Sequence, residues 1–326
     1  MKHTLIAFGT LVLGALLPAM AGAETLVLYT SQPNEDAQQT VDAFKAANPG
    51  IEVDWVRDGT TKIMAKLQAE MEAGNPAPDV LLIADTVTLE ALKRDGKLAA
   101  YKSPEAASYD AALFDADGFY YSTKLITTGI IYNTAAAMKP ESWADLAKPE
   151  AKGLVTMPSP LTSGAALIHA SSLTSTDGYG WDYYTQLKAN EALASGGNGG
   201  VLKSVATGEK AYGMIVDFMA IREKAKGAPV EFVFPTEGVS VVTEPVAILS
   251  TARNVPAAQK FVDFLLSEEG QKLVVGQGYI PARNGVALPA GYPDRAAIKF
   301  LPFDAGKALD NSEADKTKFA EIFGAS

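Results

Sequence analysis

Cysteine is absent from this 326-residue chain, and histidine occurs only twice. Without cysteine there is no disulfide, no thiolate metal site and no thiol catalysis. His3 lies close to the N-terminus, and His169 lies in an apolar run with helical character, where a packing role is commoner than a catalytic one. No Ser-His-Asp arrangement or dense metal cluster can be assembled, so the sequence predicts a protein that is not an enzyme and has no cofactor.

Basic residues are also in deficit. The chain has 28 Lys and Arg against 38 Asp and Glu, which gives a formal net charge of -10. A nucleic acid partner favours a basic surface, so this balance argues against one. It does not argue against a small anion, because a pocket can be locally positive in a negative protein. We expect a monomer that binds a small anionic solute.

Long apolar runs are missing except near the N-terminus. There, an apolar stretch over Leu5–Leu17 follows Lys2 and precedes Pro18 and the small residues 21–23. This order is typical of a secretory signal peptide. The stretch is short of the roughly 20 residues that span a bilayer, and no cysteine follows it for lipid attachment. We predict that residues 1–23 are a signal peptide, cleaved after Ala23, and that the protein is exported to the periplasm.

The chain after this segment alternates strand-like and helix-like runs. Three apolar, β-rich runs are each followed by a segment with helical spacing: 25–30 then 34–47, 51–56 then 60–73, and 80–84 then 86–94. Such a series predicts a parallel sheet covered by helices on both faces. Ligands bind at the carboxyl ends of the strands of such sheets. The polar candidates at these ends are Thr30, Ser31, Gln32, Asp58, Thr60, Thr61 and Asp85.

The rest of the chain repeats the same alternation. Strands are expected over 125–132, 154–157, 211–216 and 230–234, and helices over 142–146, 165–173, 201–206 and 257–275. We therefore expect an α/β protein with two lobes and a cleft between them. The first lobe would be 24–125, with part of 235–275 returning to it. The second would be 126–234, with part of 276–326 returning to it.

The turn before the expected helix at 165 has the chemistry of an anion site. Thr162, Ser163 and Gly164 lie where the first turn of a helix has free N–H groups and a favourable dipole for negative charge. The two hydroxyls can donate to the same anion. They can equally act as N-caps of their own helix.

Two other segments have a related form. Asp58 and Gly59 precede Thr60 and Thr61 at an expected helix start, and Asp58 either caps that helix or accepts from a ligand amine or hydroxyl. The glycine-rich run 195–200 is read as a flexible loop or as an anion nest with equal weight.

Several runs resemble the periplasmic substrate-binding proteins of ABC importers. They are 26–31, 58–61, 78–83, 148–153, 157–160, 227–231, 234–238 and 267–271. More narrowly, they are similar to the branch that contains ferric-ion, 2-aminoethylphosphonate and hexose-phosphate binders, over nearly all of the chain beyond residue 23. The resemblance implies a type II-like two-lobed fold, crossing hinge strands, closure on the ligand and delivery to a membrane permease.

The same resemblance bears on the ligand. Ferric members usually have two adjacent tyrosines where this chain has Asp217 and Phe218, and a histidine near the first strand, where Thr30-Ser31-Gln32 stands. The pairs Tyr120–Tyr121 and Tyr183–Tyr184 have aromatic neighbours and a packing explanation. The residues that hold iron are therefore missing at the expected places.

Two carboxylates complete the predicted site. Asp217 and Glu244, which follows the second crossing strand, are suited to a ligand ammonium or sugar hydroxyl; for Asp217 a strand-end cap or a salt bridge between lobes is as good an explanation. An anion cradle with a carboxylate opposite predicts a small phosphonate or phosphate ester, such as 2-aminoethylphosphonate, and a hexose phosphate fits almost as well. The alternatives are a ferric-ion binder and an exported enzyme acting on phosphorylated compounds.

Overall fold

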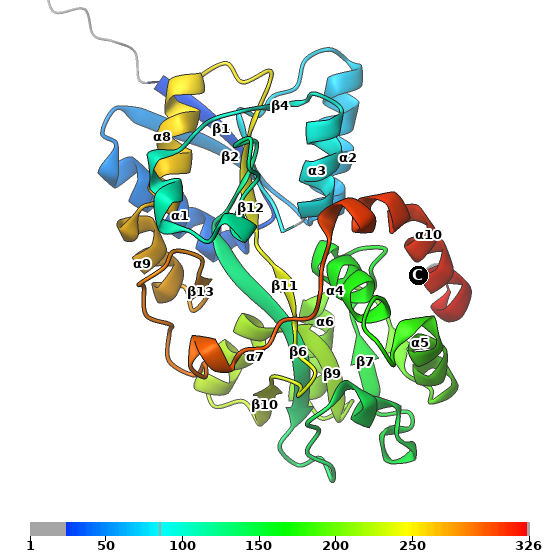
Figure 1. The fold of residues 1–326 in the computed structure, drawn as a ribbon. Helices are drawn as coiled ribbons and strands as arrows, with labels where there is room; N and C mark the ends of the chain where they lie inside the picture. The colour runs from blue at the N-terminus through cyan, green and yellow to red at the C-terminus, as the bar shows by residue number, and fades with distance from the viewer. Residues whose placement is uncertain (1–23, 85, 325–326) are drawn as a thin grey trace, which may run out of the picture.

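The computed structural model describes residues 24–84 and 86–324. The chain folds into two lobes, each built around its own β-sheet, with long strands passing between them (Figure 1). The predicted signal peptide and the candidate Asp85 lie outside the described residues. Among the residues that are described, no helix is both long and apolar enough to cross a bilayer.

The sheet of the first lobe has the order β2-β1-β3-β12-β4, and β5 pairs with β12. Its strands are β1 (Glu24–Thr30), β2 (Ile51–Arg57), β3 (Val80–Leu82), β4 (Leu98–Ala99), β5 (Tyr121–Ser122) and β12 (Pro245–Leu249). The first three are parallel, but β12 is antiparallel to its neighbours. The expectation of an all-parallel sheet is therefore wrong at β12, which enters from the second lobe and so arrives from the opposite end.

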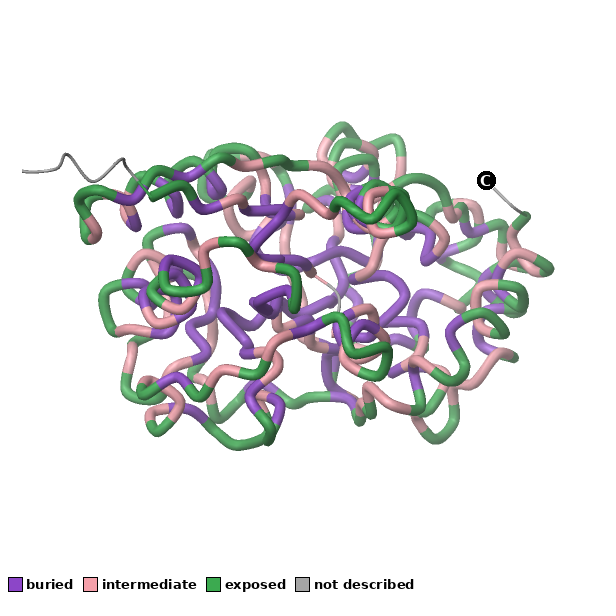
Figure 2. Tube along the Cα trace, turned by 90° about the horizontal axis from the view of Figure 1, so that it is seen from above, coloured by how far each residue is buried: buried purple, intermediate pink, exposed green. Residues whose placement is uncertain are grey.

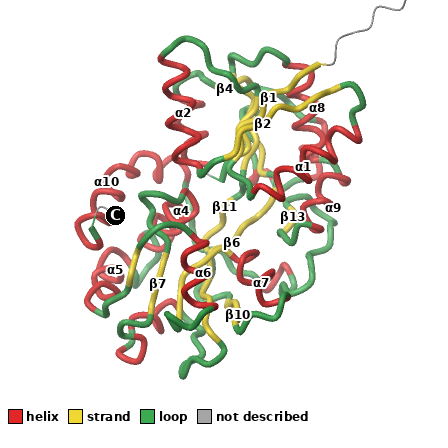
Figure 3. The backbone as a smooth tube through the Cα atoms, turned by 180° about the vertical axis from the view of Figure 1, so that it is seen from behind, coloured by secondary structure: helices red, strands yellow, loops and turns green. Residues whose placement is uncertain are grey.

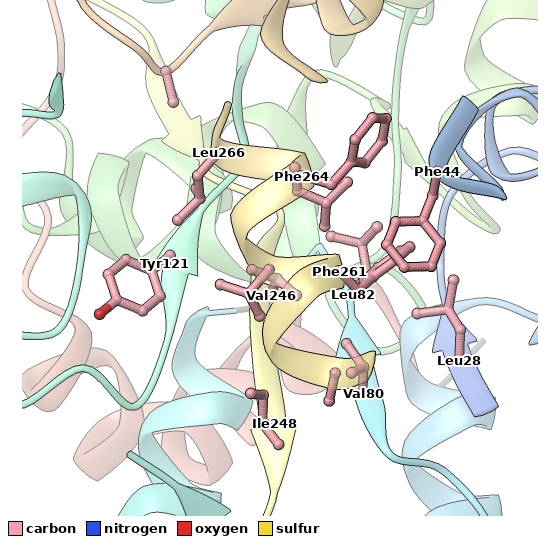
Figure 4. Close-up of a cluster of buried hydrophobic side chains, with 14 of the residues drawn as sticks. Leu28, Phe44, Val80, Leu82, Tyr121, Val246, Ile248, Phe261, Phe264 and Leu266 are labelled. Atoms are coloured by element: carbon pink, nitrogen blue, oxygen red, sulfur yellow. The ribbon is translucent and has the colours of Figure 1, made fainter. Parts of the chain in front are cut away.

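Helices cover both faces of this sheet. They are α1 (Asn34–Ala47), α2 (Thr60–Glu72), α3 (Thr86–Arg94), α8 (Val255–Leu266) and α9 (Glu268–Gly276). On one face Phe44 of α1 meets Phe261 of α8 edge to face, with ring centroids 4.9 Å apart, above Leu28 and Val246 (Figure 4). Truncating such a buried ring to alanine costs about 3–5 kcal/mol. The core of the first lobe thus includes α8, which comes late in the chain.

The sheet of the second lobe has the order β10-β6-β9-β7-β8, and β11 and β13 also pair with β6. Its strands are β6 (Lys124–Asn133), β7 (Val155–Met157), β8 (Leu193–Ala194), β9 (Tyr212–Val216), β10 (Val230–Val233), β11 (Ser240–Val242) and β13 (Ile280–Pro281). Its helices are α4 (Gly164–Thr174), α5 (Gly180–Ala189), α6 (Asn198–Ala206), α7 (Asp217–Ala225) and α10 (Ala305–Phe323). The sheet is mixed, because β6 is antiparallel to each of its partners.

Short 3₁₀ helices occupy the connections. They are η1 (Pro104–Ser108), η2 (Ala111–Leu113), η3 (Trp143–Ala147), η4 (Pro149–Ala151) and η5 (Arg295–Ala297). Buried segments gather at the centre of the molecule and exposed ones lie around its rim (Figure 2).

Two strands cross between the lobes side by side. The chain passes from β5 into β6 and returns from β11 into β12, and the views from the front and from behind agree on their course (Figures 1 and 3). The backbone N–H of Thr123 donates to the carbonyl of Thr243 at 3.2 Å, which joins the two crossings. The ends of both crossings therefore lie at the base of the space between the lobes.

Two expected helices differ from those observed. The predicted helix 257–275 is two helices, because Ser267 adopts an extended conformation and its hydroxyl caps α9 by accepting from the Gly270 N–H at 3.1 Å. The glycine-rich run 195–200 is partly helical, since α6 already begins at Asn198. In the first case a start signal inside the apolar pattern decided the boundary.

Candidate functional site

A cleft of about 420 Å³ is lined by residues of both lobes. The first lobe contributes the loops after β1 and β2, with Ser31, Arg57 and Thr60. The second lobe contributes the starts of α4, α6 and α7, and the return crossing contributes Val242 and Glu244. The cleft thus lies where the carboxyl ends of the first sheet face the second lobe.

Five helices begin at residues that line the cleft, and three of them have a glycine or a serine at the N-cap position. The N-cap positions are Gly59 for α2, Ser163 for α4 and Gly197 for α6. The first N–H groups of a helix have no partner within it, and the helix dipole adds positive potential there. For α2 and α6 no side chain caps the end. These termini offer donors to an anion in the cleft.

The structure brings together about half of the predicted site. The predicted residues that line the cleft are Ser31, Thr60, Thr162, Ser163, Gly164, Phe218 and Glu244. The described residues predicted for the site that are not part of the lining are Thr30, Gln32, Asp58, Thr61 and Asp217.

Two of the predicted residues that are not in the lining, Thr30 and Gln32, are buried beside it. Thr30 is fully buried, and its hydroxyl donates to the carbonyl of Leu82 at 2.9 Å and accepts from the N–H of Gln32 at 3.1 Å. Gln32 is also buried and donates to Glu244 at 3.2 Å. The first strand end is therefore folded onto itself, and only Ser31 of this segment reaches the lining.

Asp58 and Thr61 lie at the start of α2. The Asp58 carboxylate accepts from the N–H of Gly59 at 2.7 Å and has the Lys62 ammonium at 3.7 Å. Thr61 is exposed to solvent. Asp58 thus lies outside the lining, and its Oδ1 serves the backbone and a neighbouring cation.

The hydroxyls before α4 have divided roles. Ser163 is the N-cap, and its oxygen accepts from the N–H of Ala166 at 3.3 Å, which leaves its proton available to a ligand. The Thr162 hydroxyl donates to the carbonyl of Gly196 at 3.0 Å. Thr162 therefore joins the α4 turn to the loop before α6, and its single proton is already in use.

Asp217 does not face the cleft. It is fully buried, and its carboxylate accepts from both the N–H and the hydroxyl of Thr127, at 3.0 and 2.7 Å, and from the N–H of Phe218 at 2.6 Å. The structure thus places Asp217 outside the cleft lining, with its carboxylate bonded where β9 ends and α7 begins, as the strand-end cap alternative predicts. Burial raises the pKa of Asp217 to about 7, against the lowering effect of these donors.

The titration of Asp217 predicts a pH dependence of stability. In the unfolded chain this carboxyl titrates near 4, so between about pH 4 and 7 the folded protein binds more protons there. Stability therefore falls as pH rises through that interval. Asp217→Asn should remove this component, and the free energy of unfolding of the wild type should drop by about 2–4 kcal/mol more than that of the variant between about pH 4 and 7. Unfolding profiles measured at several pH values would contradict this if they ran parallel.

Glu244 lines the cleft but is already paired. Its carboxylate lies 2.5 Å from the Lys124 ammonium, and both side chains are almost fully buried. The Lys124 ammonium also lies 4.2 Å from the centre of the Tyr279 ring, which is part of the lining. Glu244 has a positive φ of 38°, which holds this turn in an uncommon conformation for a residue other than glycine. The carboxylate charge is thus neutralised from within the protein.

Sequence reasoning missed Arg57, which lines the cleft at the end of β2. Its Nε donates to the carbonyl of Gln32 at 2.6 Å, which fixes the guanidinium stem beside the first strand end. A basic residue at the carboxyl end of a predicted strand was the available signal. Asn198 and Tyr279 also line the cleft and were not predicted.

The groups that catalysis or iron would use are engaged elsewhere. His169 is buried against Trp143, with ring centroids 4.6 Å apart, and burial lowers its pKa to about 3. In the described part of the chain, no three His, Cys, Asp or Glu side chains could hold a metal together. The Tyr279 hydroxyl donates to Asp36, and burial followed by the charges of Glu244 and Asp36 raises its pKa well above the usual value. Its hydroxyl is therefore already hydrogen-bonded within the protein.

Residues 75–308 match the family model of bacterial extracellular solute-binding proteins. The chain belongs to this family. A probable ABC transporter periplasmic-binding protein of Sinorhizobium fredii is 26% identical over 271 residues, which cover 79% of this chain and 74% of that relative. This chain is thus a bacterial extracellular solute-binding protein.

Two solved structures have a similar fold. The periplasmic binding protein AfuA of Actinobacillus pleuropneumoniae, with fructose 6-phosphate bound, has a TM-score of 0.83 at 24% identity, over 93% of this chain and 99% of AfuA. Iron-bound HitA of Pseudomonas aeruginosa has a TM-score of 0.80 at 25% identity, over 92% of this chain and 99% of HitA. The predicted two-lobed periplasmic-binding-protein fold and its branch are confirmed.

Proposed function

We propose that this solute-binding protein captures a small phosphate ester or phosphonate and delivers it to its membrane permease. The observation that carries the proposal is the convergence of three helix N-termini, those of α2, α4 and α6, with Arg57 on one cleft. Backbone N–H groups at helix starts and a guanidinium are the donors that phosphate oxygens prefer in proteins.

Charge supports an anion over a cation. Arg57 and Glu244 are the charged side chains of the described lining, and Glu244 is neutralised by Lys124 at 2.5 Å. The cleft therefore has a positive local balance although the whole chain is negative. A polyamine or a bare metal ion would need free carboxylates or phenolates, and the described lining offers none that is unpaired.

The similar solved structures are consistent with a phosphate ester, and they also identify iron as the main alternative ligand. AfuA was solved with fructose 6-phosphate and HitA with iron, so the same fold serves both kinds of solute in other proteins. The engaged phenol of Tyr279 favours the first kind here.

Calorimetry on the purified chain without residues 1–23 tests the proposal. Inorganic phosphate, glucose 6-phosphate, 2-aminoethylphosphonate and alkylphosphonates should include saturable ligands, whereas Fe(III) and putrescine should give no specific heat. Tight binding of Fe(III) with a tyrosinate absorption band, and silence with every phosphorus compound, would overturn it. Turnover of a phosphate ester by the pure protein would instead favour an enzyme.

The proposal includes export and a monomeric state. Cleavage after Ala23 would leave a mature protein that begins at Glu24, which mass spectrometry of the periplasmic fraction measures directly. A mature mass that still includes residues 1–23 would contradict the signal peptide. Light scattering of the eluted protein checks that one chain forms the particle.

A further inference from the structure

One part of the cleft lining is apolar. It consists of Ile126, Val216, Phe218 and Val242, and all four belong to a single hydrophobic cluster. Met219 packs against the same cluster and is only partly buried. The cleft therefore meets a continuous apolar surface built by β6, β9, β11 and the first turn of α7.

The Phe218 ring of this surface is packed against two neighbouring side chains. The Phe218 ring lies 4.5 Å from the Tyr279 ring, and the Arg222 guanidinium covers it at 4.8 Å. Arg222 in turn pairs with Asp36 of α1 at 3.3 Å. These contacts hold the Phe218 ring in place, so we expect it to stay part of the apolar surface when a ligand binds.

Several polar acceptor atoms of the lining are occupied by the protein itself. The Ser31 oxygen accepts from the N–H of Ala84 at 2.8 Å, and the Asn198 carbonyl oxygen accepts from the N–H of Val216 at 3.1 Å, which leaves the protons of both side chains as donors. The hydroxyl protons of Thr162 and Tyr279 are donated to Gly196 and Asp36. The hydroxyl protons of a sugar-like solute would lose water in this cleft and find few free side-chain acceptors.

A cationic tail would also lack a partner. Asp217 is buried outside the cleft, and Glu244 is paired with Lys124. Burying an unpaired ammonium against the apolar surface costs far more than burying a methyl group of the same size.

We infer that the organic part of the ligand is an apolar tail, so that the cleft is selective for an alkyl- or arylphosphonate or an equivalent phosphate monoester. This inference rests on the proposed function, because it takes the phosphonate oxygens to be bound at the starts of α2, α4 and α6 and the tail to lie against Phe218 and Met219. Each further methylene buried there should tighten binding about three- to fourfold until the surface is filled.

An isosteric pair of ligands tests it. n-Propylphosphonate has a terminal methyl group where 2-aminoethylphosphonate has an ammonium group of similar size. The ratio of their dissociation constants therefore measures the preference for an apolar over a charged tail. n-Propylphosphonate should bind at least about tenfold more tightly, and affinity should rise from ethyl through propyl to butyl. Glucose 6-phosphate and inorganic phosphate complete the series.

Two variants test whether the preference for an alkyl tail depends on the apolar surface at Met219. Met219→Gln keeps the length of the side chain but makes it polar, and should reduce the advantage of n-propylphosphonate over inorganic phosphate several-fold. Met71→Gln, on a partly buried methionine at the far end of α2, is the matched control and should leave it unchanged. The melting temperatures of both ligand-free variants show whether folding is intact.

The outcomes separate this inference from the function on which it rests. If 2-aminoethylphosphonate or glucose 6-phosphate binds as tightly as n-propylphosphonate or more so, the apolar tail is wrong and anion capture stands. If no phosphorus compound binds, inorganic phosphate included, the proposed function itself fails. A rising alkyl series that Met219→Gln flattens supports both.

Discussion

Replacing Arg57 by glutamine should weaken the binding of a phosphonate or phosphate ester about thirtyfold. A hydrogen bond from a charged donor to a phosphate oxygen contributes about 2 kcal/mol to binding, and this is the free energy that corresponds to such a factor. Because Arg57 is exposed in the free protein, the melting temperature without ligand should change little. Isothermal titration of both proteins with the same ligand measures the effect.

A charge-matched control separates contact from long-range attraction. Arg253 is also an exposed cation of the first lobe, where it donates to Asn75 at 2.8 Å, and it is not part of the cleft lining. Arg253→Gln removes the same charge and should leave affinity within about twofold at physiological salt, since exposed charges are screened within about 8 Å. Equal losses in both variants would show that Arg57 does not touch the anion.

The largest effect on stability should come from Lys124→Met. Lys124 and Glu244 are 2.5 Å apart, with side-chain exposures of 1% and 2%. Removing the ammonium leaves a carboxylate buried without a counter-ion, which typically costs about 3–5 kcal/mol. For a chain of this size the melting temperature should fall on the order of 10 °C.

The double variant Lys124→Met with Glu244→Gln is the decisive comparison. It removes both charges at once, so it should recover more than half of the stability that Lys124→Met loses. Scanning calorimetry of the four proteins gives the coupling between the two sites. Additive losses would show that the two side chains do not depend on each other in the folded state.

The fold was predictable wherever a local signal marks both ends of an element. The sequence predicts α1 over 34–47 and α3 over 86–94 with the bounds that the structure has, because an apolar stripe ends in each case at a glycine or proline. The break at Ser267 was missed because one N-cap inside a long apolar pattern is a weak signal. The antiparallel entry of β12 depends on the return from the second lobe, which no local pattern contains.

The site was predictable by segment but not by side chain. Ser163 and Phe218 line the cleft as expected, whereas Asp217, one position before Phe218, points into the protein. The direction of a side chain where a strand turns into a helix depends on backbone angles that the sequence does not specify. The pairing of Glu244 with Lys124 joins residues 120 positions apart, and it changes the predicted charge of the cleft.

The C-terminal helix α10 contacts both lobes, so its contacts depend on how the lobes are oriented to each other. α10 packs against α3 of the first lobe and against α4 and α5 of the second, and Asp310 of this helix pairs with Arg94 of α3 at 2.7 Å. Its far end is fixed to the second lobe, where the Phe319 ring meets Tyr184 at 5.8 Å. A rotation of one lobe against the other must therefore slide one end of α10 while the other stays in place. The distance between Arg94 and Asp310, both of which are exposed, would therefore change with the angle between the two lobes.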